Sequence, residues 1–199
     1  MSIKIFEIGL MKTGSSSLGK AYEILGYKHK GWTPDAVTEF NESYDYEVLF
    51  KIIDEYDAFE DNPWNGNDFP YDISKGCDYK ILDEKYPNSK FILLERDDES
   101  WIKSMEYWCS PKLSIRDFGN LLDIDERWVT DREKIIKEKL EWKRLKFNGI
   151  KEYFRNRPND LLVMNICNGE GWKVLCPFLD KSIPDVQFPK KNITKNYED

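Results

Sequence analysis

Short apolar runs and longer helical periodicities alternate along the 199 residues of the chain. Runs rich in β-branched and aromatic residues predict strands, whereas apolar positions that recur every three or four residues predict amphipathic helices. The strands are expected at residues 3–8, 56–61, 90–96 and 160–166, and the helices at residues 15–25, 36–56, 97–108, 121–154 and 169–179. This alternation predicts an α/β fold with three layers, in which helices cover both faces of a central parallel sheet.

Two segments carry more detailed expectations. Residues 27–35 are short and mixed, which favours a second strand with a turn at Pro34. The long helix over residues 121–154 mixes Lys and Glu, which indicates a solvated face. Its apolar stripe is expected at Val129, Ile136, Leu140, Leu145 and Phe147. The length of the chain suits a single domain over residues 1–199.

Composition narrows the class of protein. Hydrophobic residues make up 40% of the chain and aromatic residues 15%, which is enough for a full core. The net charge of −7 argues against general binding to nucleic acid or a membrane surface, because both favour basic proteins. Four scattered cysteines without a CxxC pair favour neither a zinc site nor a disulfide framework. With no visible signal peptide and no apolar run of about 18 residues, a soluble, cytoplasmic protein is expected.

The segment GLMKTGSSS at residues 9–17 has the layout of a phosphate-binding loop. It lies between a predicted strand and a predicted helix, and Gly9 and Gly14 have the GxxxxG spacing of nucleotide loops. Ser15 stands where an ATP-binding loop requires lysine, and Lys12 lies inside the loop instead. Backbone N–H groups, the positive end of the helix and the Lys12 ammonium are expected to converge on one anion. Further hydroxyl groups come from Thr13, Ser15, Ser16 and Ser17.

This loop resembles the 5′-phosphosulfate loop of sulfotransferases, in which Lys or Arg precedes Thr-Gly-Ser/Thr-Ser between a strand and a helix. These enzymes transfer a sulfuryl group from 3′-phosphoadenosine 5′-phosphosulfate (PAPS) to an acceptor. The phrase IGLMKTGSSSLGKAYEILGY is similar to a branch of small sulfotransferase-like proteins. The resemblance implies a P-loop-like fold, with Lys12 at the bridging oxygen and the sulfuryl group. It also implies that Gly14, Ser15 and Ser16 hold the 5′-phosphate.

A second match concerns the other phosphate of the donor. Sulfotransferases hold the 3′-phosphate with an arginine at a strand end and a serine eight positions later, and FILLERDDESWIKSMEYW supplies Arg96 and Ser104 at that spacing. Guanidinium suits a phosphate because it can donate two parallel hydrogen bonds. The resemblance continues in GEGWKVLCPFLDKSIPDVQFPKKN, whose Lys190 and Lys191 could also reach the donor phosphates. It is weak over residues 111–159.

The acceptor hydroxyl usually needs a base. Many sulfotransferases place a histidine or glutamate after the third strand, where this chain has FEDNPW. By that resemblance Asp61 is the first candidate base and Glu60 the second, while the single histidine, His29, lies earlier in the chain. Asp61 could instead simply cap the loop before Pro63. No metal is expected, because Lys12 and the loop amides can cover the charge of the leaving group.

Two other functions stay open from the sequence. A P-loop kinase of a small metabolite would use Asp61 as a Mg²⁺ ligand, although Ser15 leaves it without a lysine for the β- and γ-phosphates. A non-catalytic module on the same fold would bind the nucleotide without turnover. In the leading hypothesis the acceptor is a small molecule or glycan, and its pocket is expected to involve the structured loop at residues 62–76.

Overall fold

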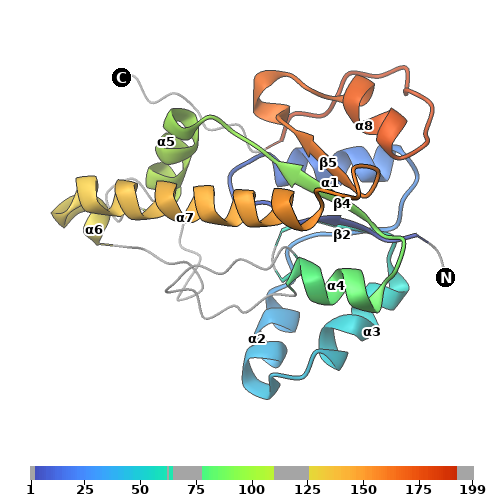
Figure 1. Ribbon diagram of the computed structural model, residues 1–199, viewed down its shortest axis with the longest axis horizontal. Coiled ribbons are helices and arrows are strands. Elements are labelled where there is room, and N and C mark those ends of the chain that lie inside the picture. The colour runs from blue at the N-terminus through green and yellow to red at the C-terminus, as the bar shows by residue number, and fades with distance from the viewer. Residues whose placement is uncertain (1–2, 62, 65–77, 110–125, 192–199) are drawn as a thin grey trace. The chain divides into compact units, whose positions relative to one another are not determined.

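The computed structural model describes residues 3–61, 63–64, 78–109 and 126–191 (Figure 1). The chain divides into two compact units, Met1–Glu95 with Phe154–Asp199 (unit 1) and Arg96–Tyr153 (unit 2). The loop predicted at residues 62–76 lies outside the described residues, except for residues 63 and 64. A single domain over residues 1–199 stays a prediction.

Unit 1 is built on a parallel sheet with the strand order β2-β3-β1-β4-β5. Its strands are β1 (Ile5–Glu7), β2 (His29–Lys30), β3 (Ala58–Phe59), β4 (Lys90–Leu94) and β5 (Leu161–Met164). In the centre, Ile5 of β1 pairs with Ala58 on one side and with Lys90 on the other. The chain leaves β1 toward one edge and later crosses to β4 and the opposite edge. This switch in direction puts the expected ligand site of an α/β sheet at the carboxyl ends of β1 and β4.

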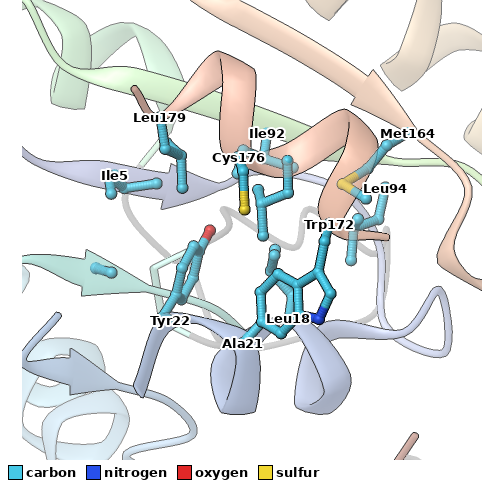
Figure 2. Packing of buried hydrophobic residues seen from close by; sticks show 12 residues of the cluster. Ile5, Leu18, Ala21, Tyr22, Ile92, Leu94, Met164, Trp172, Cys176 and Leu179 are labelled. Atoms are coloured by element: carbon cyan, nitrogen blue, oxygen red, sulfur yellow. The ribbon is translucent and has the colours of Figure 1, made fainter. Parts of the chain in front are cut away.

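One face of the sheet is covered by α1 (Ser15–Ile24) and α8 (Trp172–Phe178). Figure 2 shows side chains of both helices meeting over the strands. This cluster is apolar and buried: Ile5, Leu18, Ala21, Tyr22, Ala58, Ile92, Leu94, Met164, Trp172, Leu175, Cys176 and Leu179. Burying this much apolar surface anchors the start of α1 against β1 and β4.

The opposite face carries an aromatic cluster. Phe6 stacks on Phe59 at 5.1 Å and on Phe91 at 5.8 Å between ring centroids. Tyr86, at the end of α4 (Tyr79–Lys85), contacts both Phe6 and Phe50 of α3 (Glu47–Glu55). Helices therefore lie on both faces of a parallel sheet (Figure 1), which confirms the α/β three-layer prediction.

Three details of the helix predictions are wrong. Pro34 does not make a turn but occupies the first position of α2 (Pro34–Ser43), where a missing N–H costs nothing. The single helix expected over residues 36–56 is two helices, because Tyr44 has a φ of 53° and ends α2. Helix α4 was not expected, and it begins where the Asp78 carboxylate accepts a hydrogen bond from the Lys80 N–H at 2.8 Å.

Unit 2 contains α5 (Asp98–Cys109), α6 (Arg127–Thr130) and α7 (Arg132–Tyr153). The single helix expected over residues 121–154 is two helices in the described residues, α6 and α7. Its predicted stripe is also partly wrong, since Val129 of α6 is 42% exposed and Leu145 of α7 is 57% exposed. The buried positions of α7 are Ile135, Lys143, Phe147 and Ile150. Within the described part of the chain, no helix is long and apolar enough to cross a membrane.

Candidate active site

The loop after β1 turns sharply into α1. Lys12 has a φ of 66° and Gly14 a φ of 111°, so both lie in the left-handed region, which is rare for a residue with a Cβ such as Lys12. Gly14 precedes α1 without a side-chain cap, and its carbonyl accepts the N–H groups of Ser17 and Leu18 at 3.0 and 3.1 Å. A helix start without a side-chain cap, at the carboxyl end of a central strand, suits an anion.

Neighbouring segments hold the loop in this shape. The Thr13 hydroxyl donates to the Leu10 carbonyl at 2.6 Å, and the Thr13 carbonyl accepts the Cys167 thiol at 3.5 Å. A Cβ added to Gly14 would lie 3.3 Å from the Cβ of Ile166. Ile166 and Cys167 belong to η2 (Ile166–Asn168), which follows β5. The loop is thus packed on the β5–α8 connection, and glycine at position 14 satisfies both the backbone angle and the space.

The predicted anion ligands differ in their surroundings. Thr13, Ser15 and Ser17 are buried, whereas Lys12 and Ser16 are half-buried. The Ser17 hydroxyl oxygen accepts the backbone N–H of Lys191 at 3.0 Å. The C-terminal segment therefore runs past the first turn of α1. Binding of an anion by Lys12, Thr13, Gly14, Ser15, Ser16 and Ser17 stays a prediction.

The second predicted anion group, Arg96 with Ser104, lies in unit 2. Arg96 Nε donates to the Ser100 hydroxyl oxygen at 2.9 Å, and this hydroxyl donates to Asp97 Oδ2 at 2.5 Å. Ser104 lies one helical turn further along α5 and is 1% exposed. The Ser100 hydrogen bonds also hold the pKa of Asp97 below its usual value. Ser100 is a partner of Arg96 that the eight-residue spacing did not predict.

Lys143 of α7 fixes the backbone of the same segment. Its ammonium donates to the Arg96 carbonyl at 2.6 Å and to Asp98 Oδ1 at 2.5 Å. Its side chain is 9% exposed and lies 5.3 Å from the Trp101 ring centroid. Sequence periodicity assigned this lysine to a solvated face, and a lysine four residues before the buried Phe147 was the signal that could have found it. The roles of Arg96 and Ser104 in binding stay predictions.

Two of the three candidate bases, Glu60 and His29, lie close together near the end of β3. His29 Nε2 lies 3.5 Å from Glu60 Oε1, and His29 Nδ1 lies 3.6 Å from Glu23 Oε1. A Cβ added to Gly31 would lie 2.6 Å from Glu60 Oε1, so glycine leaves room for the carboxyl group. Asp61 follows with a φ of 66°. Glu60 and His29 were predicted as alternative bases, but in the structure their side chains lie next to each other.

Glu7 is a buried acid that the sequence reasoning passed over. It ends β1 and is 0% exposed, and the Gly9 N–H donates to its Oε1 at 2.6 Å. Burial raises the pKa of Glu7 to about 8, with a smaller contribution from the neighbouring Glu60. An acid inside an otherwise apolar strand was the available signal. Among the residues that the structure describes, no group of three or more His, Cys, Asp and Glu side chains is placed to hold a metal ion.

Comparison with known proteins agrees with this architecture. A family model described as a sulfotransferase domain matches residues 4–197, nearly the whole chain. The protein named Ava biosynthesis cluster protein M, from Aspergillus versicolor, is 28% identical over 212 aligned residues, which cover 94% of this chain and 80% of that protein. The match of the family model spans the loop between β1 and α1, the sheet and the C-terminal segment alike. The chain therefore belongs to the sulfotransferase domain family.

Proposed function

We propose that the protein transfers a sulfuryl group from PAPS to a hydroxyl or amine of an acceptor. The observation that carries this proposal is the loop between β1 and α1, in a chain of the sulfotransferase family. Lys12 precedes a helix start that no side chain caps, and Ser15 stands where an ATP-binding loop has its lysine. Such a loop suits a phosphate whose charge grows as a leaving group.

Transfer breaks the bond between sulfur and the bridging oxygen of the phosphosulfate and forms a bond between sulfur and the acceptor atom. The electron pair of the broken bond goes to the 5′-phosphate, where Lys12 and the N–H groups at the start of α1 would stabilise the new charge. The acceptor proton would pass to Asp61, with Glu60 and His29 as the alternatives. Positioning and electrostatics then supply most of the rate, as in phosphoryl transfer.

The 3′-phosphate of the donor would bind Arg96 and Ser104. Ser100 supports this assignment, because it accepts a hydrogen bond from Arg96 Nε and so helps to orient a guanidinium, whose planar fork suits a phosphate. The acceptor would be a small molecule or a glycan. The name of the Aspergillus relative, a biosynthesis cluster protein, is compatible with a small-molecule acceptor.

The proposal is tested by thermal denaturation with 3′-phosphoadenosine 5′-phosphate (PAP), the desulfonated donor. At 100 times its dissociation constant a ligand adds about 2.7 kcal/mol to the free energy of unfolding, which raises the Tm of a chain this long by about 5–10 °C. ATP should raise the Tm far less. Lys12→Ala should reduce the PAP shift, whereas Lys20→Ala, an exposed lysine of α1 paired with Glu23, should not.

Two outcomes would favour the rival functions. Protection by ATP that depends on magnesium would support a small-metabolite kinase with Asp61 as a metal ligand. Binding of PAP without sulfuryl transfer to any phenol, alcohol, amine or sugar would support a non-catalytic module. A PAP shift that neither Lys12→Ala nor Arg96→Ala reduces would contradict the proposed site.

A further inference from the structure

The end of β1 holds a buried carboxyl group in direct contact with the phosphate loop. Glu7 Oε1 accepts the N–H of Gly9, the first residue of the loop, at 2.6 Å. A Cβ added to Gly9 would lie 2.5 Å from the same oxygen and 3.2 Å from the Leu94 backbone nitrogen, so the close approach of the Glu7 side chain requires glycine at this position. The loop therefore begins at a contact between Gly9 and a carboxyl group that is 0% exposed.

The same carboxyl group reaches the segment after β3. The backbone N–H of Asp61 also hydrogen-bonds Glu7, and Asp61 has a φ of 66°. Gly9 and Asp61 follow two adjacent strands, β1 and β3, which are parallel and end at the same edge of the sheet. Glu7 thus joins the start of the phosphate loop to the residue proposed as the base.

Burial and the neighbouring carboxyl groups favour the neutral form of Glu7, and they outweigh the N–H groups of Gly9 and Asp61, which favour the ionised form. Its second oxygen, Oε2, is buried and has no hydrogen-bond partner among the described residues, and the same holds for Glu60 Oε2 and the Tyr22 hydroxyl. Two ionised carboxylates in such surroundings would repel each other without water to screen them. The titratable groups that face this carboxyl group are Glu60 and Asp61 after β3, Tyr22 on α1 and, beside Glu60, His29 of β2.

We propose that Glu7 is a positioning residue for sulfuryl transfer, which in its neutral form ties the phosphate loop to the Asp61 segment and lets the loop bind the anionic donor. The inference rests on the proposed function. It assigns to β1 a role that the loop motif does not include. An ionised Glu7 would add negative charge behind the loop and oppose the phosphates that the loop is proposed to hold.

The sign of the expected pH dependence follows from the protonation of Glu7. The pKa of Glu7 in the folded protein is about 8, against an ordinary value of 4.5. The donor site should therefore be intact at pH 7, and its affinity for PAP should fall as the pH rises through about 8. Without ligand, the folded protein keeps a proton that the unfolded chain loses above pH 4.5. Its Tm should therefore decline between pH 5 and pH 8.

The test is thermal denaturation and calorimetric titration of the full chain, with and without PAP. Titrations run from pH 7.0 to 9.5, and ligand-free melts extend down to pH 5. Glu7→Gln keeps an acceptor for Gly9 but cannot ionise, and the exposed Glu39→Gln on α2 is the control. Wild type and the control should lose about tenfold in PAP affinity over this range, the order expected for one added charge near a phosphate. Glu7→Gln should lose less than about twofold, and its ligand-free Tm should decline less with pH.

A second variant, Glu60→Gln, keeps the proposal testable if Glu7→Gln does not fold. Glu60→Gln removes the neighbouring negative charge, so the loss of PAP affinity should begin at a lower pH than in wild type. Equal pH profiles in wild type and Glu7→Gln, or an unmoved profile in Glu60→Gln, would overturn the positioning role. If wild type binds no PAP at any pH, the proposed function fails and the positioning role with it. The ligand-free melts then still report whether Glu7 holds a proton.

Discussion

The two proposed phosphate sites are built in different ways. In unit 1 the site combines the Lys12 ammonium with a stretch of backbone, which is fixed by two left-handed residues and by packing on η2 and the strands. In unit 2 it is one guanidinium, held by side chains: Ser100 bonds Arg96 Nε, and Lys143 bonds the Arg96 carbonyl.

This difference has a consequence for function. Backbone N–H groups carry partial charges that do not titrate, so a backbone loop suits the atom where charge develops during transfer. A guanidinium held by side chains suits recognition, because its planar fork distinguishes a phosphate from a hydroxyl. The loop should therefore govern the rate of transfer, and Arg96 should govern the affinity for the donor.

The largest effect is expected at Lys12. Removal of one group that stabilises developing charge typically lowers the rate about 10²–10³-fold, so Lys12→Ala should lower the rate of PAP formation from PAPS by this factor. Lys12→Arg should retain most of the activity, because the resemblance allows either cation at this position. Lys20→Ala serves as the matched control on α1. An unchanged rate in Lys12→Ala would contradict the expectation that the loop governs the rate of transfer.

A smaller effect is expected at Lys143. Lys143→Met keeps the apolar stem beside Trp101 but leaves the Arg96 carbonyl and Asp98 without their donor. A lost hydrogen bond to a charged group costs about 1.5–3 kcal/mol of stability. Because Lys143 holds the Arg96 backbone, its loss should also weaken the positioning of Arg96, and PAP affinity should fall about fivefold. Adenosine 5′-phosphate, which lacks the 3′-phosphate, should bind as before.

The control for this variant is Lys134→Met, an exposed lysine at the start of the same helix. Calorimetric titration with both nucleotides separates the two explanations for a weaker complex. If Lys143→Met weakens both nucleotides equally, the lysine acts on the fold in general and does not position Arg96.

Local sequence signals were enough to predict the strands of unit 1, helix α1 and the loop between β1 and α1. The strands are short apolar runs, and α1 starts after Gly14 and ends at Ile24, shortly before Gly26, where the chain again has a positive φ of 83°. The loop was predicted because its glycines, its cation and its hydroxyls are close together in sequence. Each of these features acts over a few residues, so no knowledge of the tertiary contacts was required.

Features that depend on tertiary contacts were not predictable in this way. Tyr44 ends α2 with a φ of 53°, although neither glycine nor proline marks the break. Lys143 is buried because Arg96, Asp98 and Trp101 surround it, and all three are more than 40 residues away in the chain. The pKa of Glu7 is raised because the fold buries its carboxyl group and, to a smaller extent, because the sheet brings Glu60 near it. Periodicity reports which positions are apolar, but it does not reveal a polar group whose partners come from elsewhere.

The central proposal is that the loop between β1 and α1 binds the 5′-phosphate of the donor and that Arg96 binds its 3′-phosphate. Calorimetric titration of wild type and Arg96→Ala with PAP and with adenosine 5′-phosphate tests it most directly. Wild type should bind PAP at least about tenfold more tightly, since a charge-assisted hydrogen bond contributes about 1.5–3 kcal/mol. Arg96→Ala should bind both nucleotides with the same, weaker affinity. A preference for PAP that survives in Arg96→Ala, or no preference in wild type, would contradict the account.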